Sequence, residues 1–286
     1  WCKTKKGIEA RPAQPFYVAL YMNHFLFSRQ NKGCITAAFY GIRWAHNMVG
    51  LQSPTENPLA QLTYEGCCRI CAHKKIRKDA LPVEILREMV EHFHKKDGTL
   101  LDNRFLIVCL IGFAGFLRIQ ELLDVQLKHI TIHSEHLEIF LPHSKVDQHR
   151  DGNTVLIAKT DTNYCPVKHT ISFLQSAGLD IKRDPDAFLI PRLHKTKKGH
   201  NASKTKGISY TRMNEIFHDG IQQYNHDQKN YGLHGLRSGG ASCASQNGVS
   251  DRLISKQGRW ASSTARNGYI EDSIEGRLIV SRSLNL

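Results

Sequence analysis

The residues with the clearest chemical potential lie near the end of the chain, in the stretch HGLRSGGASCASQNGVSDRLISKQGRWASSTARNGYI at 234–270. His234 and Arg237 are three residues apart, which places both side chains on one face of a helix. An imidazole can move a proton near neutral pH, and a guanidinium can hold an anionic oxygen. Trp260 and, nine residues later, Tyr269 add an indole N–H donor and a phenol. Taken singly, each of these residues is more often a surface or packing residue.

Two more cations could join such a site. Arg118 follows the apolar run FLIVCLIGFAGFL at 105–117, so its guanidinium is expected at the edge of a buried helix, where it requires an anion. Glu121 is available as an ion-pair partner in the resting protein. Two separated Arg residues can bracket a phosphate through forked hydrogen bonds. Lys145 lies in PHSKVDQHR between two strand-like runs, where a long cationic side chain could reach into a groove.

The elements that must position these residues are predicted to be mostly helical. Residues 13–50 show helix-period apolar spacing in two segments, and 59–75 predicts a third helix. The front of the chain is therefore predicted to be an all-α module. The charged segment HKKIRKDALP at 73–82 indicates a linker followed by a helix starting at Pro82, so we place a domain boundary after residue 79.

Beyond this boundary the pattern is helical with a small β-sheet. The run at 105–117 is broken by two glycines and is too short to span a bilayer, so it predicts a buried helix. The short runs HITIH, HLEIFLP and NTVLIA predict a β-meander, and the lysine-rich stretch at 194–206 predicts a loop. The small residues SGGASCAS after Arg237 favour close helix packing. Gly248 and Gly258 are expected as C-terminal helix caps.

The composition favours a polyanionic partner. The 286 residues carry a formal net charge of +13, from 39 Lys and Arg against 26 Asp and Glu. Nucleic acid is the first candidate for such a cation, with an anionic membrane behind it. Eight Cys without disulfide-framework spacing indicate reduced thiols in an intracellular compartment, and no signal peptide is expected. The first residue is Trp, so we expect a piece of a longer product.

Six residues resemble, in order and spacing, the active-site set of the tyrosine recombinases, also called phage integrases: Arg118, Lys145, His234, Arg237, Trp260 and Tyr269. The stretches FLRIQELL, LPHSKVDQHRDGNTVLIA and QGRW look most like recombinases of eukaryotic mobile elements of the Crypton and DIRS-like kinds. Trp260 stands where many members have His. The lysine-rich stretch at 194–206 is longer than in bacterial members.

The resemblance implies a mostly α fold with a small β-sheet. A helical, SAM-like core-binding domain would occupy residues 1–79, and a mixed α/β catalytic domain residues 80–286. The two would close around double-stranded DNA. The chain would then be a site-specific recombinase or integrase that moves a mobile element, with no cofactor, metal or ATP.

The resemblance also implies a role for each residue of the set. Tyr269 would attack phosphorus to give a covalent 3′-phosphotyrosine, and His234 would help to remove the phenolic proton. Arg118 and Arg237 would stabilise the phosphate oxygens. Lys145 would protonate the leaving 5′-oxygen, and Trp260 would donate its indole N–H to a phosphate oxygen or buttress the nucleophile's helix.

Other expectations concern partners and place. Family members form tetramers on paired DNA sites by passing a C-terminal tail between subunits, and the tail after Tyr269 is apolar at Leu278, Ile279, Val280 and Leu284. Basic runs suggest a nuclear location and DNA contacts. The candidate DNA-contacting residues are Lys74, Lys75, Arg77, Lys78, Lys195, Lys197, Lys198, Lys204 and Lys206.

Four alternatives stay open or receive little weight. A recombinase-derived protein could bind DNA without strand exchange, and a type IB topoisomerase uses similar chemistry to relax supercoils. A metal site is suggested by sixteen His, with clusters at His92/His94 and His129/His133/His136, and by CCRICAH at 67–73. CxxC lacks a second pair for zinc, however, and Cys67, Cys68 and Cys71 have the spacing of core residues. A metal-dependent nuclease would need convergent carboxylates, whereas RDPDAF at 183–188 has the composition of a turn.

Overall fold

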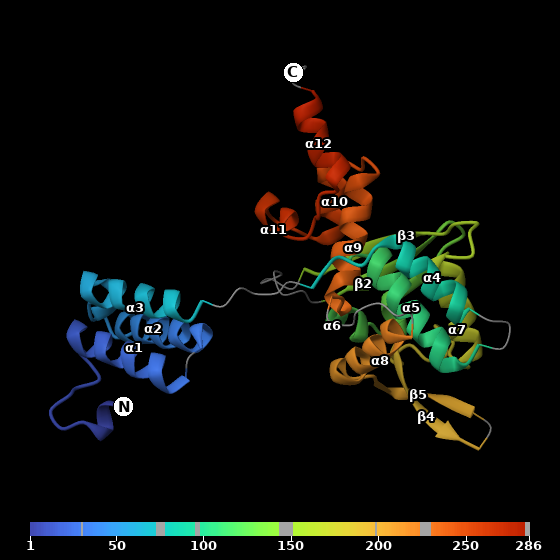
Figure 1. Ribbon diagram of the computed structural model, residues 1–286. Helices are drawn as coiled ribbons and strands as arrows, with labels where there is room; N and C mark the ends of the chain where they lie inside the picture. The colour runs from blue at the N-terminus through green and yellow to red at the C-terminus, as the bar shows by residue number, and fades with distance from the viewer. Residues whose placement is uncertain are drawn as a thin grey trace. The chain divides into compact units, whose positions relative to one another are not determined.

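The chain divides into two compact units, Trp1–Ile76 and Arg77–Leu286 (Figure 1). The computed structural model describes residues 1–29, 31–72, 78–94, 98–142, 151–197, 199–223 and 230–283. The division lies three residues before the predicted boundary at 79.

The first unit is a bundle of three helices, α1 (Pro15–Arg29), α2 (Lys32–Asn47) and α3 (Pro58–Ile70), which all contact one another. Asn31 caps α2 by accepting hydrogen bonds from two backbone N–H groups, and Asn57 caps α3 ahead of a proline. The all-α prediction for this region is confirmed. Its core contains the three clustered cysteines Cys67, Cys68 and Cys71, all buried, so they are packing residues as the helical spacing indicated.

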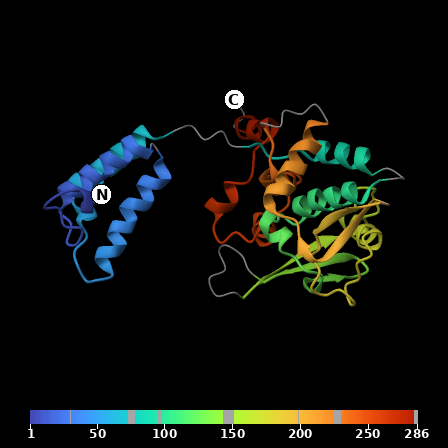
Figure 2. The ribbon, with the colours of Figure 1, turned by 90° about the horizontal axis from the view of Figure 1, so that it is seen from below.

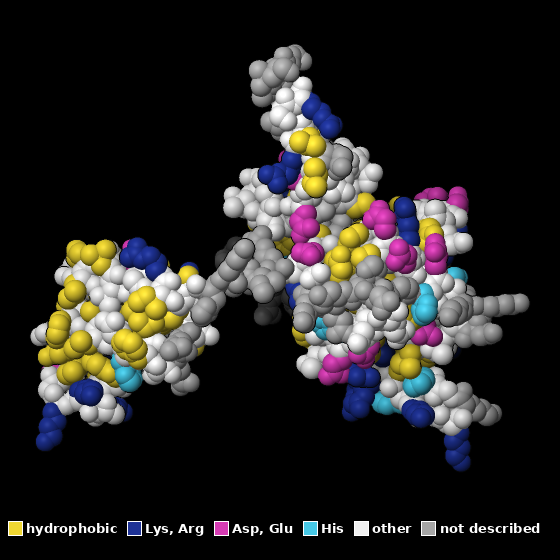
Figure 3. Space-filling model, in the orientation of Figure 1, with side chains coloured by type: hydrophobic (Ala, Val, Ile, Leu, Met, Phe, Trp, Pro, Cys, Tyr) yellow, Lys and Arg dark blue, Asp and Glu magenta, His cyan; other side chains and the backbone are white. Residues whose placement is uncertain are grey.

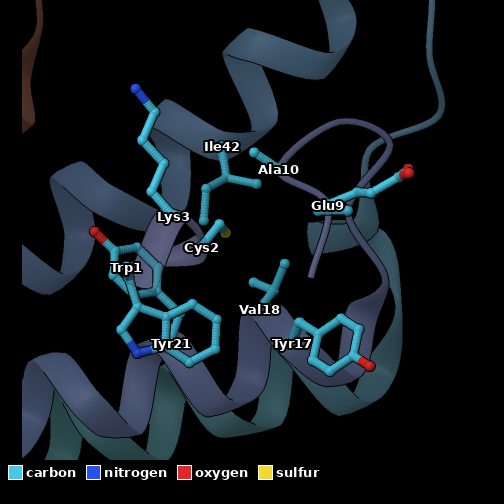
Figure 4. A pocket seen from close by; sticks show the side chains of 10 residues that line it. Trp1, Cys2, Lys3, Glu9, Ala10, Tyr17, Val18, Tyr21 and Ile42 are labelled. Carbon is cyan, nitrogen blue, oxygen red and sulfur yellow. The ribbon is translucent and has the colours of Figure 1, made fainter. Parts of the chain in front are cut away.

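The surface of the first unit is unusually apolar. Phe27 is 78% exposed, Met48 66% and Trp44 65%, and hydrophobic side chains cover much of its visible face (Figure 3). A pocket of about 340 Å³ lies against α1, with Tyr17 and Tyr21 among its walls (Figure 4). Its charged members are a Lys and a Glu, so it lacks the His and Arg pair that the chemistry would require.

The second unit is organised around α5 (Leu100–Ala114), a helix that contacts α4 (Val83–Phe93), α7 (Pro166–Ser176) and α9 (Leu233–Gln246). Thr99 and Asp102 form a capping box that starts α5 well before the predicted residue 105. The same helix ends at Ala114 and not at 117, because Phe116 adopts a left-handed backbone with φ of 46°. Arg118 therefore caps the next helix, α6 (Ile119–Leu123), a few residues beyond the buried one.

The predicted β-meander is present as an antiparallel sheet in the order β1-β2-β3 (Figure 2). The strands are β1 (Ile130–Ile132), β2 (His136–Leu141) and β3 (Asn153–Ala158). Alternate residues of β2 and β3 are buried and face the core of the unit, which is the pattern of a sheet covered on one side. Lys145 lies between β2 and β3, outside the described residues.

The lysine-rich stretch predicted as a loop is an antiparallel ribbon of β4 (Pro191–Thr196) and β5 (Gly199–Gly207). Figure 1 shows it below α8 (Tyr210–Gln222), extending from the body of the unit. The prediction was wrong because lysines mark exposure but not backbone pairing. Gly199, with φ of 129°, lies at the turn, where a side chain would be strained.

The end of the chain forms α9, α10 (Asp251–Gly258), α11 (Ser263–Asn267) and α12 (Ile274–Arg282). Close packing of α9 is confirmed: a Cβ on Gly240 would lie 2.1 Å from the carbonyl oxygen of Phe113, which is on α5. Gly248 has the left-handed backbone expected after α9. Among the described residues, no helix is both long and apolar enough to cross a membrane.

Candidate active site

Four of the predicted residues meet around a small apolar cluster at the C-terminal end of the second unit. His234 and Arg237 lie in the first turns of α9, Trp260 follows α10, and Tyr269 follows α11. The rings of Trp260 and Tyr269 have centroids 5.0 Å apart, and those of His234 and Tyr269 are 5.1 Å apart. The cluster beneath them also contains Phe116, which follows α5. A phenol, an imidazole, a guanidinium and an indole are thus brought together from separate parts of the chain.

Arg237 is completely buried and largely committed to backbone oxygens. One terminal nitrogen donates to the carbonyl of Phe116, and the other donates to that of Gly258 at 2.7 Å. Its guanidinium carbon lies 4.7 Å from the ring centroid of Trp260 and 4.8 Å from that of Tyr269. Burial, together with the charges of Arg259 and Arg118, lowers the pKa of Arg237 to about 10. At neutral pH it remains a cation held beneath the Tyr269 ring.

Three buried donors in and beside this cluster have no hydrogen-bond partner among the described residues: Nε of Arg237, Nε of Arg259 and Nε1 of Trp260. Buried N–H groups are nearly always paired in folded proteins, so each unpaired one requires an explanation. An anion that enters the site would satisfy those of Arg237 and Trp260. The expectation that Arg237 offers its whole fork to a phosphate needs revision, since both terminal nitrogens already have partners.

His234 is exposed and lies beside the partly buried Tyr269. Desolvation lowers the pKa of His234 below its ordinary value, and the positive charges of Arg237 and Arg118 lower it further. The imidazole is therefore kept neutral at pH 7, the form that can accept a proton. The Tyr269 backbone is held by Ser242, whose hydroxyl donates to the Tyr269 carbonyl at 3.4 Å, and by the Arg266 carbonyl, which accepts from the Tyr269 N–H at 2.8 Å.

Arg118 is paired with Glu121 at 2.6 Å, as the sequence predicted for the resting protein. The sequence did not identify Arg259, which donates to the other oxygen of the same carboxylate at 2.7 Å. Burial opposes ionisation of Glu121, but the two guanidiniums outweigh it, and the pKa of this carboxyl is lowered. The signal for Arg259 was its place in QGRW, directly before Trp260.

The other predicted residues are distributed as follows. Lys145, Lys74, Lys75, Arg77 and Lys198 lie outside the described residues. Lys78 donates to the carbonyl oxygen of Tyr231 at 3.1 Å, at the start of α9. The remaining lysines, Lys195, Lys197, Lys204 and Lys206, belong to the β4–β5 ribbon or its turn, and Lys204 is ion-paired with Asp184 at 2.8 Å.

Among the described residues, one group of possible metal ligands lies on the three-stranded sheet. His133 and His136 flank the turn between β1 and β2, and together with Glu138 they place one ligand atom each within 4.8 Å of the others. Their side chains are exposed or half-buried. His129, which the sequence grouped with the two histidines, is not a member. Asp184 of the RDPDAF segment is engaged with Lys204 and Arg183.

Comparisons with known proteins agree with this architecture, although no family model matches the chain. The whole chain aligns with an integrase/recombinase xerD homolog from Selenomonas ruminantium at 24% identity, and the alignment covers 80% of that protein. The Tn1549 transposon integrase, in complex with circular intermediate DNA, superposes with a TM-score of 0.62 at 10% identity over 98% of this chain and 89% of that one. Its fold is that of the tyrosine recombinases.

A second structure extends the likeness. The XerH site-specific recombinase in a post-cleavage complex with its difH substrate superposes with a TM-score of 0.52 at 15% identity, over 73% of this chain. The present chain spans about half of the XerH chain, 53%. The shared fold confirms the predicted fold class, and the sequence relative that the whole chain matches is an integrase/recombinase homolog.

Proposed function

We propose that this protein is a site-specific DNA recombinase that cuts and rejoins duplex DNA through a covalent 3′-phosphotyrosine. The observation that carries the proposal is the meeting of Tyr269 with His234, Arg237 and Trp260, where Nε of Arg237 and Nε1 of Trp260 are buried and have no partner among the described residues. The sequence relative and the structural neighbours are recombinases and integrases, which supports the same assignment.

The proposed reaction combines the geometry around Tyr269 with the role that the family resemblance gives to Lys145. The phenolic oxygen of Tyr269 attacks the scissile phosphorus, a P–O bond to tyrosine forms, and the bond to the 5′-oxygen breaks. Neutral His234 accepts the phenolic proton, and Lys145 returns a proton to the leaving 5′-oxygen. Rejoining reverses these steps, so the energy of the broken bond is stored in the phosphotyrosine and no ATP is consumed.

The phosphate would be held by donors of three residues. Nε of Arg237 and Nε1 of Trp260 are buried and unpaired, so they can bind an oxygen without breaking an existing hydrogen bond. Arg118 is 21% exposed and reaches its present partner by a single terminal nitrogen that lies 2.6 Å from Glu121. We propose that it turns toward the phosphate when DNA binds.

Duplex DNA is the proposed partner of the basic surface. The net charge of +13 and the exposed lysines of the β4–β5 ribbon support contacts with the phosphate backbone (Figure 3). The first unit would serve as the core-binding clamp and the second as the catalytic domain. The mobile-element role, the Crypton or DIRS-like kinship and a nuclear location belong to the same proposal, and the transposon integrase among the structural neighbours is consistent with the first of these.

Assembly of copies is proposed to use α12. Three apolar side chains of this helix are exposed: Ile274 at 72%, Ile279 at 62% and Leu278 at 41%. A pocket of about 700 Å³ lies on the same unit, between the end of α5, β3, α9 and α10, and is lined mainly by apolar residues such as Leu253 and Leu156. We propose that α12 of one copy fills this pocket on another, which would join four copies on paired DNA sites.

The test is to incubate the protein, without metal or ATP, with nicked suicide duplexes from the ends of its source element. The expected result is a denaturation-resistant protein–DNA adduct that is absent with Tyr269→Phe, while DNA binding is retained. An adduct that persists in Tyr269→Phe would refute the assignment of the nucleophile. DNA binding without any adduct, across several sites, would instead favour a recombinase-derived binding protein.

A further inference from the structure

Arg259 has a backbone conformation and an environment that are unusual for an arginine. It ends α10 in the left-handed region, with φ of 56° and ψ of 42°, a conformation that normally favours glycine or asparagine. Its side chain is only 3% exposed, although arginine is rarely buried without a purpose. Strained residues of this kind collect at functional sites, where the surroundings hold them in place.

The contacts of Arg259 connect both ends of the candidate active site. One terminal nitrogen lies 2.7 Å from a carboxylate oxygen of Glu121 and 3.3 Å from the carbonyl oxygen of Phe116. The same carbonyl accepts from Arg237, and the same carboxylate accepts from Arg118. Arg259 therefore contacts the partners of both arginines that are proposed to bind the phosphate.

The proposed function creates a charge problem at Glu121. Its side chain is only 8% exposed, and Arg118 supplies one of its two ion pairs. When Arg118 turns to a phosphate, the Glu121 carboxylate loses one of its two ion-pair partners. A nearly buried carboxylate is strongly disfavoured in its ionised form unless a cation pairs with it. It would also draw Arg118 back and repel the incoming phosphate.

We propose that Arg259 is a positioning residue that holds Glu121 as an ion-paired carboxylate after Arg118 leaves it for the scissile phosphate. Arg259 makes the exchange possible because its contact uses the other oxygen of the carboxylate, so it does not have to move. The two terminal nitrogens of Arg259 also donate to backbone carbonyls, including that of Gln257 at 3.0 Å, and these bonds fix the guanidinium. The inference rests on the proposed function for the role of Arg118.

The first test follows the ionisation of Glu121 by NMR in protein with ¹³C-labelled glutamate carboxyls, the signal being assigned by its loss in Glu121→Gln. The variant Arg118→Gln imitates the departure of Arg118, and Glu121 is expected to keep a pKa below its ordinary value. With Arg118→Gln and Arg259→Gln combined, both guanidiniums are gone and only the backbone N–H of residue 118 still donates to the carboxylate, so burial should raise the pKa above that value. A raised pKa with Arg118→Gln alone, or a lowered one in the double variant, would overturn the proposal.

The second test uses adduct formation. Arg259→Gln should slow the adduct by about 10- to 100-fold, the scale expected for a misplaced catalytic group. Adding Glu121→Gln removes the anion that retains Arg118, so the double variant should react faster than Arg259→Gln. A purely structural role predicts that the double variant is slower still. Arg212→Gln is the control, because it also removes an arginine from an ion pair with a glutamate, Glu215, but this pair is exposed and lies on α8.

The two tests separate the proposals. If wild-type protein forms no adduct, the proposed function fails, but the titration of Glu121 still decides whether Arg259 alone can hold the carboxylate ionised. If the adduct forms and Glu121→Gln fails to rescue Arg259→Gln, the role of Arg259 is refuted while the recombinase assignment stands.

Discussion

The contact between Gly258 and Trp260 allows a quantitative prediction about the floor of the site. A Cβ on Gly258 would lie 2.1 Å from Cζ3 of Trp260, 2.2 Å from Cε3 and 2.5 Å from Cη2, all atoms of the six-membered ring. The indole cannot move away easily, because it is 8% exposed and lies against Arg237, Tyr269 and Phe116. Gly258→Ala should therefore strain the packing of the nucleophile and the buried cation.

The magnitude follows from the cost of overpacking a core. Gly258→Ala should destabilise the second unit by about 1–3 kcal/mol, and a unit of this size loses about 2–4 °C of melting temperature per kcal/mol. Truncation of a buried Trp to Ala lowers the free energy of unfolding by about 3–5 kcal/mol, and Trp260→His should lower it by less. Imidazole lacks the three indole atoms that a new Cβ would meet. The free energy of unfolding of the double variant should therefore be about 1–3 kcal/mol higher than the sum of the two single destabilisations predicts.

The assay is thermal and urea unfolding of the four proteins in a double-mutant cycle, with adduct formation measured in parallel. Imidazole can donate a hydrogen bond to a phosphate oxygen, so Trp260→His should keep part of the cleavage activity. If the two changes were additive within about 0.5 kcal/mol, the contact between Gly258 and the indole would not govern the packing, and the reasoning would be refuted.

Three further predictions concern pH, packing and assembly. Because the pKa of His234 is lowered, the rate of adduct formation should stay constant as the pH is lowered through neutrality and fall only below about 6.5, the ordinary His value. A rate that already falls above pH 7 as the pH is lowered would contradict the role of His234 as a neutral base. Gly240→Ala should destabilise the second unit by about 1–3 kcal/mol. Gly41→Ala on α2 is the control: its new methyl group would meet nothing within 4 Å, so it should stabilise the first unit by about 0.5–1 kcal/mol. Equal effects of the two changes in denaturant unfolding would show that the close approach of α9 to α5 is unimportant. Truncation before Glu275 should abolish assembly on paired DNA sites in sedimentation experiments, and unchanged assembly would exclude α12 as the connecting element.

Local sequence signals determined most of the elements, because their physical causes are local. The alternation of buried and exposed residues in β2 and β3 follows from a strand's period of two. The three-residue spacing of His234 and Arg237 does place both side chains in the site. The pairing of Arg118 with Glu121 was also predictable, since the two are neighbours along the chain.

The sequence-based predictions were wrong where the structure depends on residues that are distant in the sequence. Gly258 was expected to cap α10, but the left-handed residue is Arg259, whose side chain is held by the carboxylate of Glu121. Gly258 is required for packing instead, because the ring of Trp260 fills the space that a Cβ would take. The lysines of 194–206 showed exposure, whereas hydrogen bonds between β4 and β5 made the stretch a ribbon.

The candidate site itself is a tertiary product. The sequence specifies a tyrosine, a histidine, an indole and several arginines, with spacings that resemble those of a recombinase. Only the fold brings the carbonyl of Phe116 to Arg237, 121 residues away, and the carboxylate of Glu121 to Arg259, 138 residues away. These contacts determine which buried N–H groups are already paired and which have no partner among the described residues. The sequence determines which chemical groups are present. The fold determines which charged groups are buried next to one another, and therefore which of them form pairs.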